Sequence, residues 1–471
     1  MTKHRKWTVA LLLGLIMLAL VAGPVSAQEE GPTTAELAKS INTVWVLIAG
    51  FLVFFMQAGF GFLEAGFVRS KNVVNIMAEN FLDTTMTTIG FWAAGFGIMF
   101  GTGTALFGME WFFLRNLPPE LNGLPPLAFF FFQFAFSAAA STIASGLMAE
   151  RTSFRADLIY SFFTGLLIYP VVGHWIWGSD GWLASLGMLD FAGSTVVHLV
   201  GALVGLAGTL VLGPRKAKEF GQDVKTIRGH NIPLAALGTF ILWLGWFGFN
   251  PGSTLGATNA NLIALIVLNT DFAATTGAIA AIFLAWRATG KWDASMAFNG
   301  ALGGLVAITA PCAFVTPNAA LLIGVIAGTL TYFGVGLMER LRVDDPVGAF
   351  PVHGISGVFG TLAVGLWATD TGLFYGGGWH QLGVQALGDV AVITFVLPVS
   401  LLMFAGIKRI AGLRVPPEIE SAGLDLAYHG IESYPEFAGV ELHGIHIGDS
   451  RAADASTVGL GDLGVAESVA S

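Results

Sequence analysis

Two stretches of this chain decide its fold: DFAGSTVVH, from Asp190 to His198, and DPVGAFPVH, from Asp345 to His353. Both read Asp-x7-His, and both lead into an apolar segment rich in small residues. Aligned on their aspartates, the copies also share three identical pairs: Gly193 with Gly348, Val197 with Val352, and Gly205 with Gly360. The pattern is a weak internal repeat whose copies start 155 residues apart.

Each copy opens a segment long enough to cross a lipid bilayer. A histidine eight residues after its aspartate lies roughly 12 Å below one membrane face at helical rise. Because the hydrocarbon core is about 30 Å thick, both imidazoles are expected near its middle.

The composition of the 471 residues indicates an integral membrane protein. Hydrophobic residues make up 54% and charged residues 11%, with a mean hydropathy of +0.72, whereas a soluble domain has about 25% charged residues. The net charge of -9 says little about a ligand, because several acids gather in the last sixty residues. The single cysteine, Cys312, excludes an intrachain disulfide, and its apolar surroundings do not favour metal or thiol chemistry.

Residues 1–27 are typical of a cleavable signal peptide. A basic start is followed by an apolar stretch from Val9 to Ala22 and by Val25-Ser26-Ala27, after which the chain turns polar. We expect cleavage after Ala27. The alternative is an uncleaved first transmembrane helix.

The rest of the chain predicts an all-α membrane domain over residues 28–411. Eleven apolar spans are expected: 42–68, 77–103, 125–149, 155–177, 191–212, 231–250, 259–288, 295–314, 319–340, 348–367 and 383–411. With the new N-terminus outside, 17 of the 22 Lys and Arg fall on the inner side, as the positive-inside rule requires. The C-terminus is then cytoplasmic.

This topology makes the repeat an inverted one. The fifth span enters from outside and the tenth from inside, which indicates an inverted five-helix pseudo-repeat with a central pore and a site near the midplane. His198 and His353 are expected to meet there. In a dry lumen the two imidazoles should be mostly neutral, each with one donor and one acceptor nitrogen.

Other polar and aromatic residues allow two interpretations. Asp190 and Asp345 suit helix N-caps, although Asp190 could also stabilise a cation at the outer mouth. Phe132 and Phe136 share one helix face, as do Trp246, Phe249 and Ser253, and all are expected near the outer ends of their spans, as is Trp177. Such stripes are typical of core or lipid contact, but they can also form a cation–π cup.

Four further polar residues within spans receive no assigned role. Glu64 and Asp271 face unknown partners, and Asn250 and Asn299 are expected to form helix–helix hydrogen bonds. Residues 412–438 are polar and read as a cytoplasmic regulatory tail, and 439–471 as a disordered extension.

The chain resembles the ammonium transporter, methylammonium permease and Rhesus family over roughly residues 35–435. The resemblance is carried by five stretches, in family order: FQFAFSAAASTIASGLMAER, DFAGSTVVHLVGALVGLAGTLVLGPR, GWFGFNPGS, DDPVGAFPVHG and GLDLAYHG. In the first span, Glu64 is a form that only part of the family shows.

The resemblance implies a role for each matching residue. Phe132, Trp177 and Ser253 look like the outer ammonium recruitment site, with Asp190 buried nearby. Phe136 and Phe249 resemble the stacked rings that gate the pore, and His198, His353 and Trp246 resemble its lining. It also implies homotrimers in the cell membrane, with one pore in each subunit and a tail that contacts PII-type signal proteins.

The expected mechanism is recruitment of NH4+, its deprotonation and passage of NH3 past the histidine pair, with methylammonium as a further candidate substrate. No enzyme activity, cofactor, metal or nucleic-acid partner is expected. An ammonium sensor with low flux is the alternative. A serine protease reading of GISG at 354–357 lacks a suitably placed histidine, and no lysine lies within a span for a retinal pump.

Overall fold

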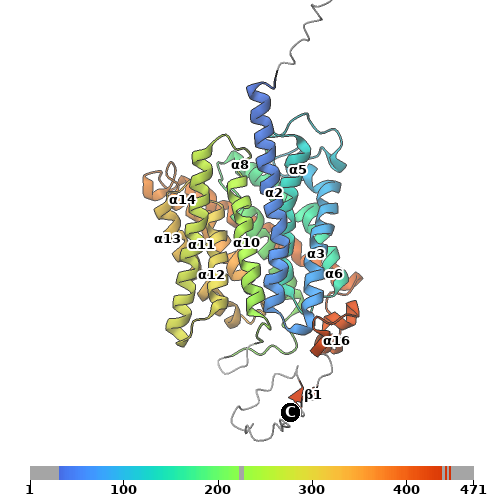
Figure 1. Cartoon of the computed structure of the whole chain (residues 1–471). Helices are drawn as coiled ribbons and strands as arrows, with labels where there is room; N and C mark the ends of the chain where they lie inside the picture. Colours follow the sequence, from blue (N-terminus) through green and yellow to red (C-terminus); the bar gives the residue numbers. More distant parts are fainter. Residues whose placement is uncertain (1–30, 222–226, 438–440, 443–444, 447–471) are drawn as a thin grey trace, which may run out of the picture.

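The computed structural model describes residues 31–221, 227–437, 441–442 and 445–446. They form a bundle of long helices that run between two opposite faces (Figure 1). The N-terminal end of α2 lies at one face, called outer here after the predicted topology, and the tail helix α16 lies at the other, called inner. The predicted signal peptide, 1–27, lies outside the described residues, as does most of the predicted extension 439–471.

Within the described residues, eleven helical units cross the bundle, which confirms the predicted all-α fold. They are α2 (Thr34–Phe67); α3 (Val73–Gly90) with η2 (Phe91–Gly95) and α4 (Phe96–Phe100); α5 (Pro126–Met148); α6 (Phe154–Phe163) with η4 (Thr164–Ile168) and α7 (Tyr169–Trp177); η5 (Ser194–Leu199) with α9 (Val200–Leu212); α10 (Ile232–Gly252); α11 (Ala260–Thr289); α12 (Ala294–Thr309); α13 (Pro317–Arg340); η6 (Phe350–Ile355) with α14 (Ser356–Trp367); and α15 (His380–Ile410). Nine of these units are long and apolar enough to span a membrane. The others are α12, which has 16 residues, and the α3 unit, which carries Glu79 and Asp83.

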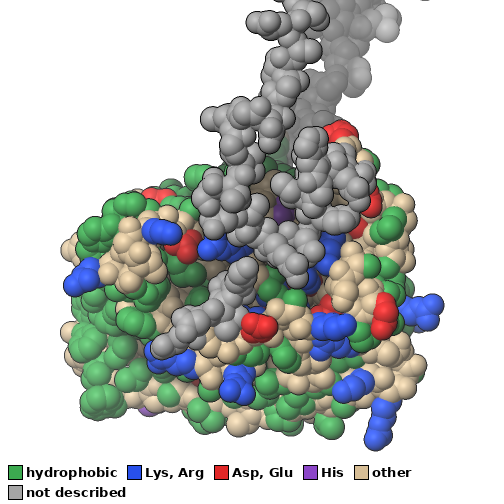
Figure 2. Space-filling model, turned by 90° about the horizontal axis from the view of Figure 1, so that it is seen from below, with side chains coloured by type: hydrophobic (Ala, Val, Ile, Leu, Met, Phe, Trp, Pro, Cys, Tyr) green, Lys and Arg blue, Asp and Glu red, His purple; other side chains and the backbone are tan. Residues whose placement is uncertain are grey.

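Short elements connect these units or form the tail that follows α15. They are η1 (Ser70–Asn72), η3 (Phe112–Leu114), α8 (Trp182–Ser185), η7 (Leu373–Tyr375), α16 (Pro417–Ala422), η8 (Asp425–His429), η9 (Pro435–Phe437) and the paired strands β1 (Glu441–Leu442) and β2 (Ile445–His446). The tail packs against the inner end of α3, where the Asp425 carboxylate accepts a hydrogen bond from the backbone N–H of Asn75 at 2.8 Å. Figure 2 shows this inner face, with Lys and Arg side chains spread over it.

Local sequence explains where helices start and how closely they pack. Thr33 and Glu36 form a reciprocal capping box at the start of α2. Between α2 and α10, a methyl group on Gly238 would lie 2.2 Å from the Leu63 backbone nitrogen, so only glycine permits this approach.

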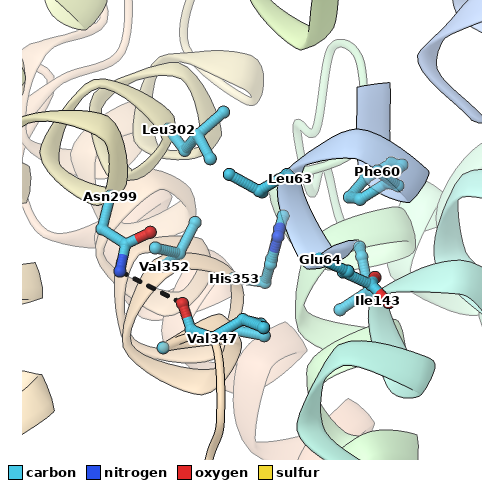
Figure 3. A pocket seen from close by; sticks show the side chains of 11 residues that line it. Phe60, Leu63, Glu64, Ile143, Asn299, Leu302, Val347, Val352 and His353 are labelled. Atoms are coloured by element: carbon cyan, nitrogen blue, oxygen red, sulfur yellow. Dashed lines mark hydrogen bonds between the residues drawn. The ribbon is translucent and has the colours of Figure 1, made fainter. Parts of the chain in front are cut away.

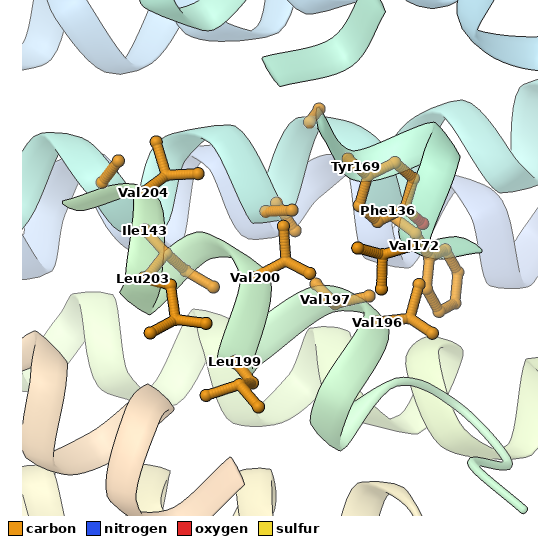
Figure 4. Packing of buried hydrophobic residues seen from close by; sticks show 14 of the residues in the cluster. Phe136, Ile143, Tyr169, Val172, Val196, Val197, Leu199, Val200, Leu203 and Val204 are labelled. Atoms are coloured by element: carbon orange, nitrogen blue, oxygen red, sulfur yellow. The ribbon is translucent and has the colours of Figure 1, made fainter. Parts of the chain in front are cut away.

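The two inverted copies interlock at the centre of the bundle. The α9 helix packs on η6 of the second copy, and α14 packs on η5 of the first. The first copy also packs on α5 and α7, and Figure 4 shows Val197 and Val200 among buried apolar side chains that include Phe136 and Tyr169. This packing fixes η5 and η6, which carry the two histidines.

Candidate functional site

The two histidines of the repeat face one another in the middle of the bundle. His198 lies on η5 and His353 on η6, and their Nδ1 atoms are 3.2 Å apart. The rings are nearly parallel, with centroids 5.2 Å apart and planes inclined by 22°. Because two donors or two acceptors cannot bond, one Nδ1 must carry a hydrogen while the other accepts it.

The aspartate of each copy caps the segment that carries its histidine. Both carboxylate oxygens of Asp190 accept backbone N–H bonds, four in all, at 2.9–3.0 Å. Asp345 accepts three at 2.8–3.0 Å. Gly193 and Gly348 follow in positive-φ conformations, at +117° and +76°, which only glycine adopts easily. The geometry therefore matches the predicted N-cap interpretation of both aspartates.

Aromatic rings cover His198 on its outer side. The His198 ring stacks at 5.2 Å from Trp246 and at 5.4 Å from Phe249. Phe249 in turn lies 4.1 Å from Phe136, centroid to centroid. The Trp246 indole donates a hydrogen bond to Thr309 Oγ1 at 2.9 Å, which fixes its orientation. The two predicted gate residues thus lie between the outer pocket and His198.

A pocket of about 330 Å³ lies outside these rings and brings together most of the predicted recruitment residues. Phe132, Trp177 and Ser253 line it together with Phe136. The Trp177 indole donates to the Asp190 carbonyl at 2.7 Å, and Ser253 Oγ donates to the Phe249 carbonyl at 2.8 Å. The Asp190 carboxylate is not among the pocket-lining groups, because its oxygens face the start of η5.

A second, much smaller cavity lies on the inner side of His353 (Figure 3). Its volume is about 10 Å³, roughly the room that one water molecule needs. Most of its wall is apolar, and its side-chain polar groups come from Glu64, Asn299 and His353. Asn299 donates to the Val347 carbonyl at 3.1 Å. Sequence reasoning gave Glu64 no role, so its place beside the histidine is new.

Sequence reasoning also missed a buried polar stripe on α3. Asn75, Glu79, Asn80 and Asp83 are each at most 2% exposed. The signal was present, because polar residues recur at spacings of three and four within a predicted span. Asp157 on α6 is buried close to this stripe, since Ser161 of the same helix donates to Asp83.

A charged network at the inner face was missed as well. Arg215 binds Glu150 at 2.8 Å and Asp344 at 2.8 Å, and Arg69 binds Glu150 at 3.0 Å. Burial alone would raise the pKa of Glu150, but the charges of Arg215 and Arg69 outweigh it and lower that pKa to about 2. Burial would likewise raise the pKa of Asp344, but the hydrogen bonds and charge of Arg215 outweigh burial and lower that pKa to about 2.

Metal-binding geometry is not seen in the described part of the chain. There, no group of three or more His, Cys, Asp or Glu residues is arranged to hold a metal ion.

Two inverted copies that bring polar side chains together halfway through a helical bundle define a membrane transport protein. Comparison with known proteins specifies the class. The model of the Ammonium Transporter Family matches residues 44–434. Ammonium transporter Amt2 of Archaeoglobus fulgidus is 42% identical over 457 residues, covering 92% of this chain and 96% of that protein. Ammonium transporter 1 member 3 of Solanum lycopersicum is 37% identical, covering 85% and 94%.

Solved structures agree with these relatives. One described as "Sensor Amt Protein" is 41% identical, with a TM-score of 0.79 over 83% of this chain and 99% of that chain. The structure of Candida albicans Mep2 is 28% identical, with a TM-score of 0.77 over 82% and 89%. The chain belongs to the ammonium transporter family. It is a multi-pass membrane protein, and its family is one of transporters rather than enzymes.

Proposed function

We propose that this protein recruits NH4+ in the outer pocket, deprotonates it, and conducts NH3 past His198 and His353. The observation that carries the proposal is the histidine pair, buried and joined at 3.2 Å, directly behind the closely packed rings of Phe136 and Phe249. A bare cation would lose its hydration at this constriction, whereas neutral ammonia would not pay that cost.

The outer pocket has the chemistry to attract a small cation. The rings of Phe132 and Trp177 offer π faces, and the Ser253 hydroxyl offers an oxygen lone pair, since its hydrogen is used by Phe249. Asp190 is buried behind the pocket wall, where its carbonyl accepts the Trp177 indole N–H, and its carboxylate adds negative charge near the pocket. In this proposal Asp190 supports recruitment from behind the pocket rather than by touching the ion.

The test is the current evoked by ammonium pulses on a solid-supported membrane that carries purified protein. Replacing both histidines by Leu should abolish selective ammonium transport and lower the current at least about a hundredfold, as for loss of a positioned proton-transfer group. Phe333→Leu, an exposed substitution on α13, is the control. Unchanged current and unchanged selectivity over potassium in the double variant would overturn the mechanism.

A sensor with low flux is the second candidate, because a structure described as "Sensor Amt Protein" is 41% identical to this chain. A sensor would bind ammonium, visible as a calorimetric signal, with little current. A transporter would give both binding and sustained current, and methylammonium uptake would show how strictly the pocket selects.

We extend the proposal to assembly and place. The family resemblance supports a homotrimer in the cell membrane with one pore in each subunit, and Lys and Arg on the inner face support a cytoplasmic C-terminus (Figure 2). A PII-type signal protein is the proposed partner of the docked tail. Light scattering of the purified protein tests the trimer, and pull-down with such a protein tests the partner.

A further inference from the structure

Glu64 is the one acidic side chain in the small cavity beneath His353. It lies near the inner end of α2, and Figure 3 shows it across that cavity from the His353 ring. Its side chain is buried, with the residue only 2% exposed. An ionisable group at this depth in a membrane protein is costly and usually marks a pathway.

The hydrogen bonds around Glu64 suit two protonation states. Ser145 Oγ lies 3.0 and 3.2 Å from the two Glu64 oxygens and 2.7 Å from the Thr142 carbonyl. A hydroxyl has one hydrogen, so Ser145 can donate it to only one of these neighbours at a time. When Glu64 is a carboxylate, Ser145 can donate to it. When Glu64 is protonated, Ser145 can turn its hydrogen to Thr142 and accept the new proton's bond.

The second partner of Glu64 does not restrict this exchange. Asn80 Nδ2 donates to Glu64 Oε2 at 3.0 Å, a bond that the oxygen can accept in either state. A carboxyl group that served only to brace two helices would need one fixed set of partners. Here the neighbours accommodate both the charged and the neutral form.

We propose that Glu64 receives the proton that ammonium leaves at the histidine pair and passes it toward the cytoplasm. This inference rests on the proposed function. NH4+ gives its proton to the pair, and NH3 moves on; the imidazolium of His353 then releases a proton, through one water in the cavity, to the Glu64 carboxylate. The imidazole returns to neutral, and Glu64 becomes a carboxylic acid that later releases the proton inward. One NH3 and one H+ thus cross for each NH4+ taken up.

Polar side chains continue from Glu64 along α3 to the inner face. Asn80 binds Glu64, and one turn further Asn75 Nδ2 donates to Glu79 Oε1 at 2.8 Å. Asn75 Oδ1 lies 3.2 Å from His429 Nε2 of the docked tail. The stripe therefore places two hydrogen-bonded groups between the cavity and the surface, Asn80 with Glu64 at the cavity and Asn75 with Glu79 and His429 at the inner end of α3.

The experiment separates charge movement from ammonia movement in proteoliposomes. Solid-supported membrane current reports the proton, and stopped-flow fluorescence of a trapped pH dye reports the alkalinisation caused by NH3. In Glu64→Gln, which keeps the size and polarity of the side chain, we expect the current to fall at least about tenfold while alkalinisation persists. Asp389→Asn, a change at an acid of α15 that is 3% exposed and does not line the cavity, is the matched control and should keep its current.

Two further variants distinguish a loss of proton transfer from a loss of folding. Ser145→Ala removes the hydroxyl that accommodates the proton and should lower the current a few-fold with ammonia flux unchanged, and Glu64→Asp should recover part of the current lost in Glu64→Gln. Wild-type current together with full current in Glu64→Gln overturns the inference, as does equal loss of current and ammonia flux. A wild-type protein with neither signal overturns the proposed function instead.

Discussion

The two inverted copies are alike in backbone and unlike in surroundings. In each, an aspartate caps a π-helical segment, a positive-φ glycine follows, and a histidine projects into the centre. The histidine of the first copy is covered by Trp246 and Phe249, whereas that of the second borders the cavity with Glu64. The two Asp-x7-His copies thus place the histidines, and residues on other helices make the outer side of the pair differ from the inner side.

This difference explains how two similar inverted copies can support transport in one direction. The outer half offers aromatic faces, which suit a cation arriving from water. The inner half offers a carboxyl group, which suits a proton leaving the pair. Neither Trp246 nor Glu64 lies in an Asp-x7-His copy, since they lie on α10 and α2, the helices that open the two predicted five-helix halves.

The largest expected effect comes from breaking the link between the copies. Arg215 follows the helix of the first copy and binds Asp344, which immediately precedes the second. Arg215→Met leaves the buried Asp344 without its ion-pair partner and Glu150 with Arg69 alone, so we expect a loss of about 3–5 kcal/mol in stability. Thermal unfolding in detergent measures this loss. The control is Lys39→Met, which breaks the exposed ion pair with Glu120 and should cost at most about 1 kcal/mol. Equal effects would contradict the prediction.

Acid should weaken the same link. Glu150 and Asp344 have folded pKa values of about 2, below their ordinary values of 4.5 and 3.8. Because the pKa of each carboxyl is lower in the folded than in the unfolded state, its contribution to the free energy of unfolding is complete above the unfolded-state pKa. This contribution is lost as pH falls from about 4.5 toward 2. For Glu150 the loss reaches about 3 kcal/mol. Unfolding temperatures measured across that range should fall steeply in wild type and less in Arg215→Met; parallel curves would exclude this origin.

The two aspartate caps should differ in strength. Asp190 accepts four backbone bonds and is 5% exposed, while Asp345 accepts three and is only partly buried. We expect Asp190→Ala to cost about 2 kcal/mol and Asp345→Ala about 1 kcal/mol. Denaturant unfolding of both variants gives the comparison. A larger cost at Asp345 would show that cap satisfaction does not set the stability of the copies.

The smallest effect concerns the ring that covers His198. Thr309→Val removes the acceptor of the Trp246 indole and leaves a buried N–H without its partner. We expect about 1 kcal/mol of destabilisation and a current reduced less than in the double histidine variant. If Thr309→Val reduced the current as much as the double histidine variant does, the orientation of Trp246 would matter as much to transport as the histidine pair.

Much of this architecture could be predicted because its signals are local. Asp190 and His198 mark their copy within nine residues, and apolar length alone located the spans. The inner network could not be predicted, since Glu150, Arg215 and Asp344 are far apart in sequence and each resembles an ordinary loop charge. The α3 stripe was within reach, because Glu79 and Asp83 keep helical spacing, but only packing shows that the stripe faces inward.

The π-helical turns under both histidines have one more consequence. In η5 the His198 amide bonds to the carbonyl five residues back, Gly193, rather than four. Each turn therefore contains one residue more than an α-helix needs, and a residue more or less rotates the following side chains by about 100°. Deleting one residue from either turn would keep the histidine in the sequence but point its imidazole away from the other histidine. The number of residues in these two six-residue segments therefore matters to the pore as much as their identity.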